Sequence, residues 1–140
     1  MTTIEFPHDL YYDQRHGWAR LQSGIISQGL TDFGQRIAKE VIFVEIPRLG
    51  RSVQQGETLL SMESGKWVGR VPAMVSGKII TVNEELEIDP TLINESPYHA
   101  GWLVEIQPED TTELTNLMSW NSQAFITFIE SEKNKYASLF

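Results

Sequence analysis

The sequence predicts a mainly β fold, a small barrel or sandwich with helices gathered mostly at one end. Three observations favour it: short runs rich in β-branched and aromatic residues, glycine-containing turns between them, and a helical periodicity confined to the end of the chain. From the length of 140 residues we expect one domain over residues 1–140. Residues 111–140 would be a helical C-terminal extension of that domain.

Strands are expected wherever β-branched and aromatic residues cluster between turn-forming residues. The expected strands cover residues 18–21, 24–27, 41–46, 58–62, 68–73, 79–82 and 101–106. Residues 22–24 form a candidate hairpin turn between the first two strands. Thr31 and Asp32 are candidate N-caps of a short helix. Turns at residues 55–57 and 75–78 separate the later strands.

The second half of the chain adds helical segments. Asp89 followed by Pro90 predicts a short helix with the aspartate at its N-cap. The acidic run over residues 84–89 is expected to be a solvated loop, with a docking patch as the alternative. In the tail, apolar residues recur at helical spacing, which predicts one or two helices broken near residues 119–122. These positions are Leu114, Leu117, Met118, Phe125, Phe128 and Ile129. We expect the last three to pack internally, with partner binding as the alternative.

Composition excludes several classes of function. The net charge of −8 would repel phosphate, so nucleic acid is not an expected partner. The chain has no cysteine, so redox chemistry must come from an attached group. It shows no signal peptide and no membrane-spanning run, so we expect a cytoplasmic protein that does not bind membranes. Three scattered histidines do not suggest a metal site, and nucleotide-binding and nucleophile motifs are missing, so we expect no enzyme activity.

One lysine stands in a position suited to carrying a prosthetic group. Lys66 follows Ser64 and Gly65 between two expected strands, with Gly56 ten residues before it and Gly77 eleven after. This spacing places Lys66 near the apex of a hairpin, and we expect Gly65 to supply a positive φ for the turn. A group linked to such an exposed amine would form a long arm able to visit several active sites. The alternative is a charged residue that only solubilises a turn.

Several motifs, in matching order over about residues 12–106, resemble the H-protein family of the glycine cleavage system. They are His16-Gly17-Trp18, the GLTDFGQ run from Gly29, the VIFVEIP run from Val41, Glu63-Ser64-Gly65-Lys66, Val75-Ser76-Gly77, and the NESPY and GWL runs near residue 100. The family has ESVK where this chain has ESGK, and its lysine carries lipoate. The resemblance implies a barrel-sandwich hybrid fold, as in lipoyl and biotinyl carriers, with lipoate attached covalently to Lys66. It also implies that a lipoate-attaching enzyme reads Glu63, Ser64 and Gly65.

The chain departs from the family directly after the lysine. Residues 67–74 read WVGRVPAM, so Trp67 and Arg70 replace small and acidic residues beside the arm. We expect Trp67, Arg70 and His16 to contact the arm or a partner, although Trp67 could equally pack on the barrel. The departures favour a second H-protein-like group, the lipoate-binding proteins of sulfur-compound oxidation, whose partner is a heterodisulfide-reductase-like complex.

Two alternatives to a sulfur-pathway carrier remain open. The first is an H protein that carries the aminomethyl group between the glycine cleavage enzymes. The second is an H-protein-like domain that is never modified. Biotin is disfavoured as the cargo, because its lysine usually lies between methionines, whereas Gly65 and Trp67 flank Lys66 here.

Overall fold

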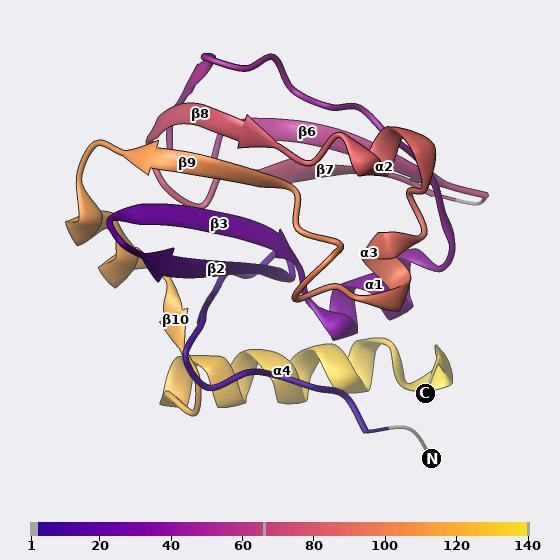
Figure 1. Ribbon diagram of the computed structural model, residues 1–140. Helices are drawn as coiled ribbons and strands as arrows, with labels where there is room; N and C mark the ends of the chain where they lie inside the picture. The colour runs from indigo at the N-terminus through magenta and orange to yellow at the C-terminus, as the bar shows by residue number, and fades with distance from the viewer. Residues whose placement is uncertain (1–2, 66, 140) are drawn as a thin grey trace.

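The structure, a computed structural model that describes residues 3–65 and 67–139, contains two antiparallel sheets packed as layers (Figure 1). In the larger sheet the strand order is β10-β1-β2-β3-β9-β8-β5, and in the smaller it is β4-β6-β7. The strands of the larger sheet are β1 (Tyr11–Tyr12), β2 (Gly17–Gln22), β3 (Ile25–Leu30), β5 (Ser52–Val53), β8 (Gly77–Val82), β9 (Val104–Pro108) and β10 (Met118–Ser119). Those of the smaller sheet are β4 (Val41–Val44), β6 (Thr58–Ser64) and β7 (Val68–Pro72). The prediction of a mainly β fold is confirmed.

Short helices join the strands, and one longer helix lies near the end of the chain (Figure 1). The helices are α1 (Asp32–Ala38), α2 (Glu85–Ile88), α3 (Leu92–Glu95), η1 (Thr111–Asn116), α4 (Gln123–Lys135) and η2 (Ala137–Leu139). Within residues 3–65 and 67–139, no helix has the length and apolar character needed to cross a membrane.

The β2–β3 hairpin has the turn that the sequence predicts. Ser23 and Gly24 both have positive φ, 53° and 77°. Two consecutive left-handed residues match the right-handed twist of the flanking strands, as in type I′ turns. The register pairs Trp18 with Gly29 across the hairpin. The Trp18 ring is fully buried and lies over Gly29, where a Cβ atom would approach it to 2.6 Å.

The main core fills the space between the two sheets, and a second apolar cluster lies beneath α4. The second cluster consists of Leu10, Tyr12, Trp18, Tyr98, Met118, Phe125 and Ile129. Its members come from both ends of the chain, because β1 pairs with β10 in an antiparallel register. Phe125 and Ile129 are buried and Phe128 packs against this cluster, as expected for packing residues.

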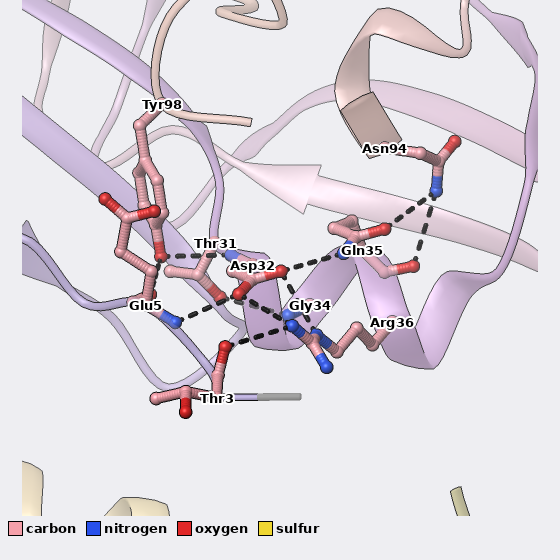
Figure 2. Close-up of polar contacts among 9 residues, drawn as sticks. All are labelled: Thr3, Glu5, Thr31, Asp32, Gly34, Gln35, Arg36, Asn94 and Tyr98. Atoms are coloured by element: carbon pink, nitrogen blue, oxygen red, sulfur yellow. Dashed lines mark hydrogen bonds and ion pairs between the residues drawn. The ribbon is translucent and has the colours of Figure 1, made fainter. Parts of the chain in front are cut away.

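A network of polar contacts holds α1 against the N-terminal segment and α3 (Figure 2). The Thr31 hydroxyl accepts a hydrogen bond from the Gly34 amide at 3.0 Å, which confirms the predicted N-cap. The Asp32 carboxylate accepts from the backbone of Glu5 at 2.9 Å and from the Arg36 guanidinium at 3.1 Å. The pKa of Asp32 is lowered: burial opposes the shift, but these hydrogen bonds outweigh it. The position of α1 is therefore closely determined.

Several element boundaries differ from the sequence prediction. The acidic run is not a loop, since residues 85–88 form the helical turn α2 and bury Leu86 in the core. The next helix has its N-cap at Thr91 rather than at Asp89. The Asp89 carboxylate instead accepts hydrogen bonds from the Thr91 amide and hydroxyl, which forms a local turn before the helix. Strand β4 ends at Val44, two residues earlier than expected.

Candidate cofactor-attachment site

The β6–β7 hairpin surrounds the position of the predicted attachment lysine. The two strands are antiparallel, with Glu63 opposite Val68, and the Ser64 amide donates to the Trp67 carbonyl at 2.8 Å. Lys66 itself lies outside the described residues. In Figure 1 the hairpin extends to the right-hand edge of the molecule, past α2 and α3. The hydrogen bond between Ser64 and Trp67 therefore closes the hairpin at the ends of the two strands.

The three residues before Lys66 have different environments. Glu63 and Gly65 are exposed, whereas Ser64 is 7% exposed and its Oγ has no hydrogen-bond partner among the described residues. The expectation of a positive φ at Gly65 is wrong, since its φ lies outside the left-handed region. The backbone bond between Ser64 and Trp67 closes the turn without a left-handed residue at position 65.

Trp67 is held against its own strand. A Cβ atom added to Gly69 would lie 1.8 Å from Cη2 of the Trp67 ring, so the indole rests on the bare backbone of Gly69. The residue as a whole is still 38% exposed. Trp67 therefore packs on the barrel and also presents one face to the groove beside the hairpin.

This groove, which we name the hairpin groove, has a volume of about 270 Å³. Its walls come from the β1–β2 loop, the end of β3, α1, Trp67 with the second half of β7, and the end of α4. The lining residues are Gln14, Arg15, His16, Leu30, Gly34, Ile37, Trp67, Arg70, Val71, Glu132, Lys135 and Tyr136. Of the predicted site residues, the structure brings together His16, Trp67 and Arg70 here. Glu63, Ser64 and Gly65 do not line the groove.

His16 anchors the last turns of α4 to the β1–β2 loop. Its Nε2 lies 2.6 Å from a Glu132 carboxylate oxygen, and its ring stacks on Phe33 with a centroid separation of 4.9 Å. Burial lowers the pKa of His16, and the hydrogen bond to Glu132 only partly opposes this. A neutral ring that donates from Nε2 to Glu132 leaves Nδ1 as an acceptor, and this buried atom has no partner among the described residues. His16 and Trp67 both line the groove beside the hairpin. No group of three or more metal-ligating side chains occurs in the described ranges.

The hairpin groove is basic although the protein as a whole is acidic. Arg15, Arg70 and Lys135 line it, and none of them forms an ion pair with a carboxylate of residues 3–65 or 67–139. Arg15 instead donates to the Arg70 carbonyl at 3.4 Å. Glu132 is the one carboxylate among the described lining residues, and His16 occupies it.

The residues of the hairpin groove fit a lipoyl arm. Such an arm is a hydrocarbon chain that ends in two sulfur atoms, and it needs an apolar wall next to its attachment point. Leu30, Ile37 and Val71 supply aliphatic surface, and the Trp67 ring adds an aromatic face one residue from position 66. Gly34 leaves space for the β1–β2 loop, because a Cβ there would lie 2.8 Å from the Cβ of His16.

Arg15, Glu132 and Lys135 were not anticipated from the sequence. Glu132 and Lys135 are three residues apart, so they share a face of α4, and this spacing was the one available signal. Their contact with a loop more than one hundred residues earlier has no local sequence signature.

A hairpin centred on a lysine, set on a two-layered β fold beside an apolar-walled groove, defines a carrier of a covalently attached group. The comparisons with known proteins agree with this class. Residues 10–131 match the family described as "Glycine cleavage H-protein". A "Glycine cleavage system H protein" from Anaeromyxobacter sp. (strain K) is 40% identical over 130 residues, which is 93% of this chain and 100% of the relative. "Glycine cleavage system H protein 4" from Aquifex aeolicus (strain VF5) is 37% identical over 91% of this chain and 75% of its own length.

The chain therefore belongs to the glycine cleavage H-protein family. A crystal structure of a glycine cleavage system H protein from Mycobacterium marinum matches with a TM-score of 0.78 and 30% identity, over 87% of this chain and 98% of that one. This likeness confirms the barrel-sandwich hybrid fold. Proteins of the family carry lipoate covalently on a lysine and are not catalysts, so the chain is a non-enzymatic lipoyl carrier.

Proposed function

We propose that lipoate is amide-linked to Lys66 and that the chain carries the aminomethyl group between the glycine cleavage enzymes. The observation that supports this most directly is the β6–β7 hairpin, whose strands end at Ser64 and Val68 around Lys66 and beside a groove suited to the arm. The choice of pathway rests on the relatives, which are named glycine cleavage system H proteins at about 40% identity. The same evidence does not favour the sulfur pathway over glycine cleavage.

The residues around Lys66 have separate roles in this proposal. Glu63, Ser64 and Gly65 form the strand end that the lipoate-attaching enzyme reads. Trp67, with His16 and Arg70, faces the arm when it rests in the groove. When bound, the lipoyl group would supply a disulfide that can open to hold cargo on one sulfur and leave a thiol on the other, while the chain positions the arm.

The last helix belongs to the functional unit in this proposal. Residues 111–140 extend the same domain rather than form a second one, because Glu132, Lys135 and Tyr136 complete the hairpin groove. We propose the cytoplasm as the compartment, since a dithiol carrier without cysteines of its own suits a reducing environment.

A carrier for sulfur-compound oxidation is the second candidate, and one observation favours it. Arg15, Arg70 and Lys135 line the groove, and the single carboxylate there is occupied by His16. An aminomethyl group is cationic when protonated and would be repelled, whereas oxidised sulfur groups are anionic. In this case the partner is a heterodisulfide-reductase-like complex.

Two measurements test the proposal. The first is the intact mass and peptide map of the protein from its native cells, with Lys66→Arg and Lys78→Arg variants produced in the same cells. We expect a lipoyl increment on Lys66 that is lost in Lys66→Arg and kept in Lys78→Arg. An unmodified Lys66 in cells whose other lipoyl proteins are loaded would overturn the carrier function.

The second measurement is glycine–bicarbonate exchange with the glycine decarboxylase of the same organism. Exchange that requires the lipoylated protein supports the glycine cleavage proposal. Failure of the lipoylated protein, while another H protein is active in the same assay, would refute that pathway. Binding to a heterodisulfide-reductase-like complex under those conditions would then support the second candidate.

A further inference from the structure

We propose that the hairpin groove holds a thiol of the reduced lipoyl arm as a thiolate, so that this thiol ionises at lower pH than in free dihydrolipoamide. Arg70, Lys135 and Arg15 are the positioning residues for this effect. The inference rests on the proposed attachment of lipoate to Lys66. It concerns the dithiol form of the arm, which holds no cargo, and is therefore independent of which cargo the arm takes up.

The arm can reach these cations because the groove begins beside its attachment point. Trp67 directly follows Lys66, and its ring is both stacked on Gly69 and part of the groove wall. From there the lining continues along β7 to Arg70 and across to Lys135 on α4. An arm lying along the aliphatic side of the groove places its terminal sulfurs among the charged groups.

The charges around the groove favour an anion. The charged and titratable groups that line it are Arg15 and His16 from the β1–β2 loop, Arg70 from β7, Glu132 and Lys135 from α4, and Tyr136. Three of them, Arg15, Arg70 and Lys135, are basic side chains. Lys135 also lies 5.3 Å from the centre of the Tyr136 ring. Asp13, on the same loop as Arg15, accepts hydrogen bonds from the Arg15 and Gly17 amides and does not line the groove.

The neutral state of His16 matters for this charge balance. Its Nε2 lies 2.6 Å from the Glu132 carboxylate, and a neutral ring leaves the negative charge of Glu132 in place, so three basic side chains face one carboxylate in the groove. Arg15, Arg70 and Lys135 form no ion pair with a carboxylate among the described side chains. Cations next to a thiol favour its ionised form, whereas burial disfavours it. Because the groove is open to solvent, the cations should prevail.

The step itself is a simple ionisation. The S–H bond breaks, the proton passes to solvent water, and the electron pair stays on the sulfur beside the cations. No oxidant or reductant takes part. If the cations lower the thiol pKa by about one pH unit, the thiolate fraction at neutral pH rises about tenfold. Since the thiolate is the nucleophile in thiol–disulfide exchange, the reduced arm would be primed for reoxidation by the disulfide of a partner oxidoreductase, which accepts its two electrons.

The chain offers a clean way to test this, because it has no cysteine and the arm would carry its only thiols. The holo-protein is first checked for the lipoyl mass on Lys66 and reduced with a phosphine that carries no thiol. Thiolate absorbance is then titrated against pH, with the same protein alkylated on the arm as the baseline for tyrosine. Arg70→Gln and Lys135→Gln each remove one groove cation. Lys133→Gln is the matched control, since it removes one exposed charge from α4 outside the groove.

We expect the arm of the unchanged protein to ionise at lower pH than free dihydrolipoamide, and both groove variants to ionise at higher pH than the unchanged protein. Lys133→Gln should leave the titration unchanged. The inference is overturned if the lipoylated protein titrates like free dihydrolipoamide, or if Lys133→Gln acts as strongly as the groove variants. If no lipoyl group is found on Lys66, the proposed function fails with it. If the group is present and titrates normally, only the present inference fails.

Discussion

Replacing Gly29 by alanine tests how the β2–β3 hairpin and the second core are built. Gly29 lies opposite Trp18 in the antiparallel register, and the Trp18 ring covers it. An added Cβ would lie 2.6 Å from Cζ2 and 2.7 Å from both Cε2 and Nε1 of that ring. Ordinary contact begins near 3.4 Å, so the ring would have to move by about 0.8 Å.

Trp18 has little freedom to make this movement. It is fully buried, and its indole N–H donates to the Pro97 carbonyl at 2.9 Å. Overpacking of this kind costs about 1–3 kcal/mol, and a weakened hydrogen bond about 1 kcal/mol more. Alanine also restricts the unfolded chain more than glycine does, which stabilises the folded state by about 0.4–1 kcal/mol and partly offsets these costs. We therefore expect Gly29→Ala to lower the free energy of unfolding by about 1–3.5 kcal/mol.

Urea unfolding followed by far-ultraviolet circular dichroism measures this change. Gly24→Ala in the same hairpin is the control, because Gly24 has a φ of +77° and nothing lies within 4 Å of its Cβ position. Gly24→Ala should lower the free energy of unfolding by only about 1 kcal/mol, because alanine is strained in the left-handed conformation. If Gly29→Ala is no less stable than Gly24→Ala at equal urea dependence, the packing argument is refuted.

Two further predictions concern the hairpin groove. Because burial lowers the pKa of His16, the unfolded chain binds a proton near pH 6.5 that the folded chain does not. The free energy of unfolding should therefore fall as the pH drops below about 6.5, by at most about 1.4 kcal/mol per pH unit from this group. In urea titrations at a series of pH values, His16→Gln should show a smaller fall over this range. An equally steep fall in the variant would contradict the assignment to His16. Gly69→Ala should displace the Trp67 ring into solvent, because the new Cβ would lie 1.8 Å from it. Acrylamide quenching of tryptophan fluorescence should then rise with little loss of stability. Gly65→Ala is the control: its Cβ position lies in open space, so the quenching should be unchanged. Equal quenching in both variants would show that the Trp67 ring does not rest on Gly69.

Local features were predictable from the sequence because their causes lie within a few residues. The Ser23–Gly24 turn, the Thr31 cap and the hairpin around Lys66 each follow from adjacent residue types. The acidic run was misjudged because burial of Leu86, a tertiary effect, outweighs the polarity of its neighbours.

Features that depend on distant pairing were not predictable in the same way. The two-residue strands β1 and β10 are too short to carry a pattern; β1 forms because it pairs with β2 and β10, and β10 because it pairs with β1. The basic wall of the groove also escaped prediction, since it needs α4 to return to the β1–β2 loop. Periodicity placed a helix in the tail, but it could not indicate that Glu132 would meet His16.

The joining of the two chain ends by β1 and β10 has a consequence for the order of assembly on the ribosome. The β6–β7 hairpin pairs residues close in sequence and can form as soon as residue 72 has emerged. The groove beside it lacks a wall until residues 132–136 are synthesised, near the end of translation. If Lys66 carries the arm, as we propose, a modifying enzyme can meet the hairpin before the resting place of the arm is complete. Attachment of the prosthetic group and completion of its groove are therefore separable in time.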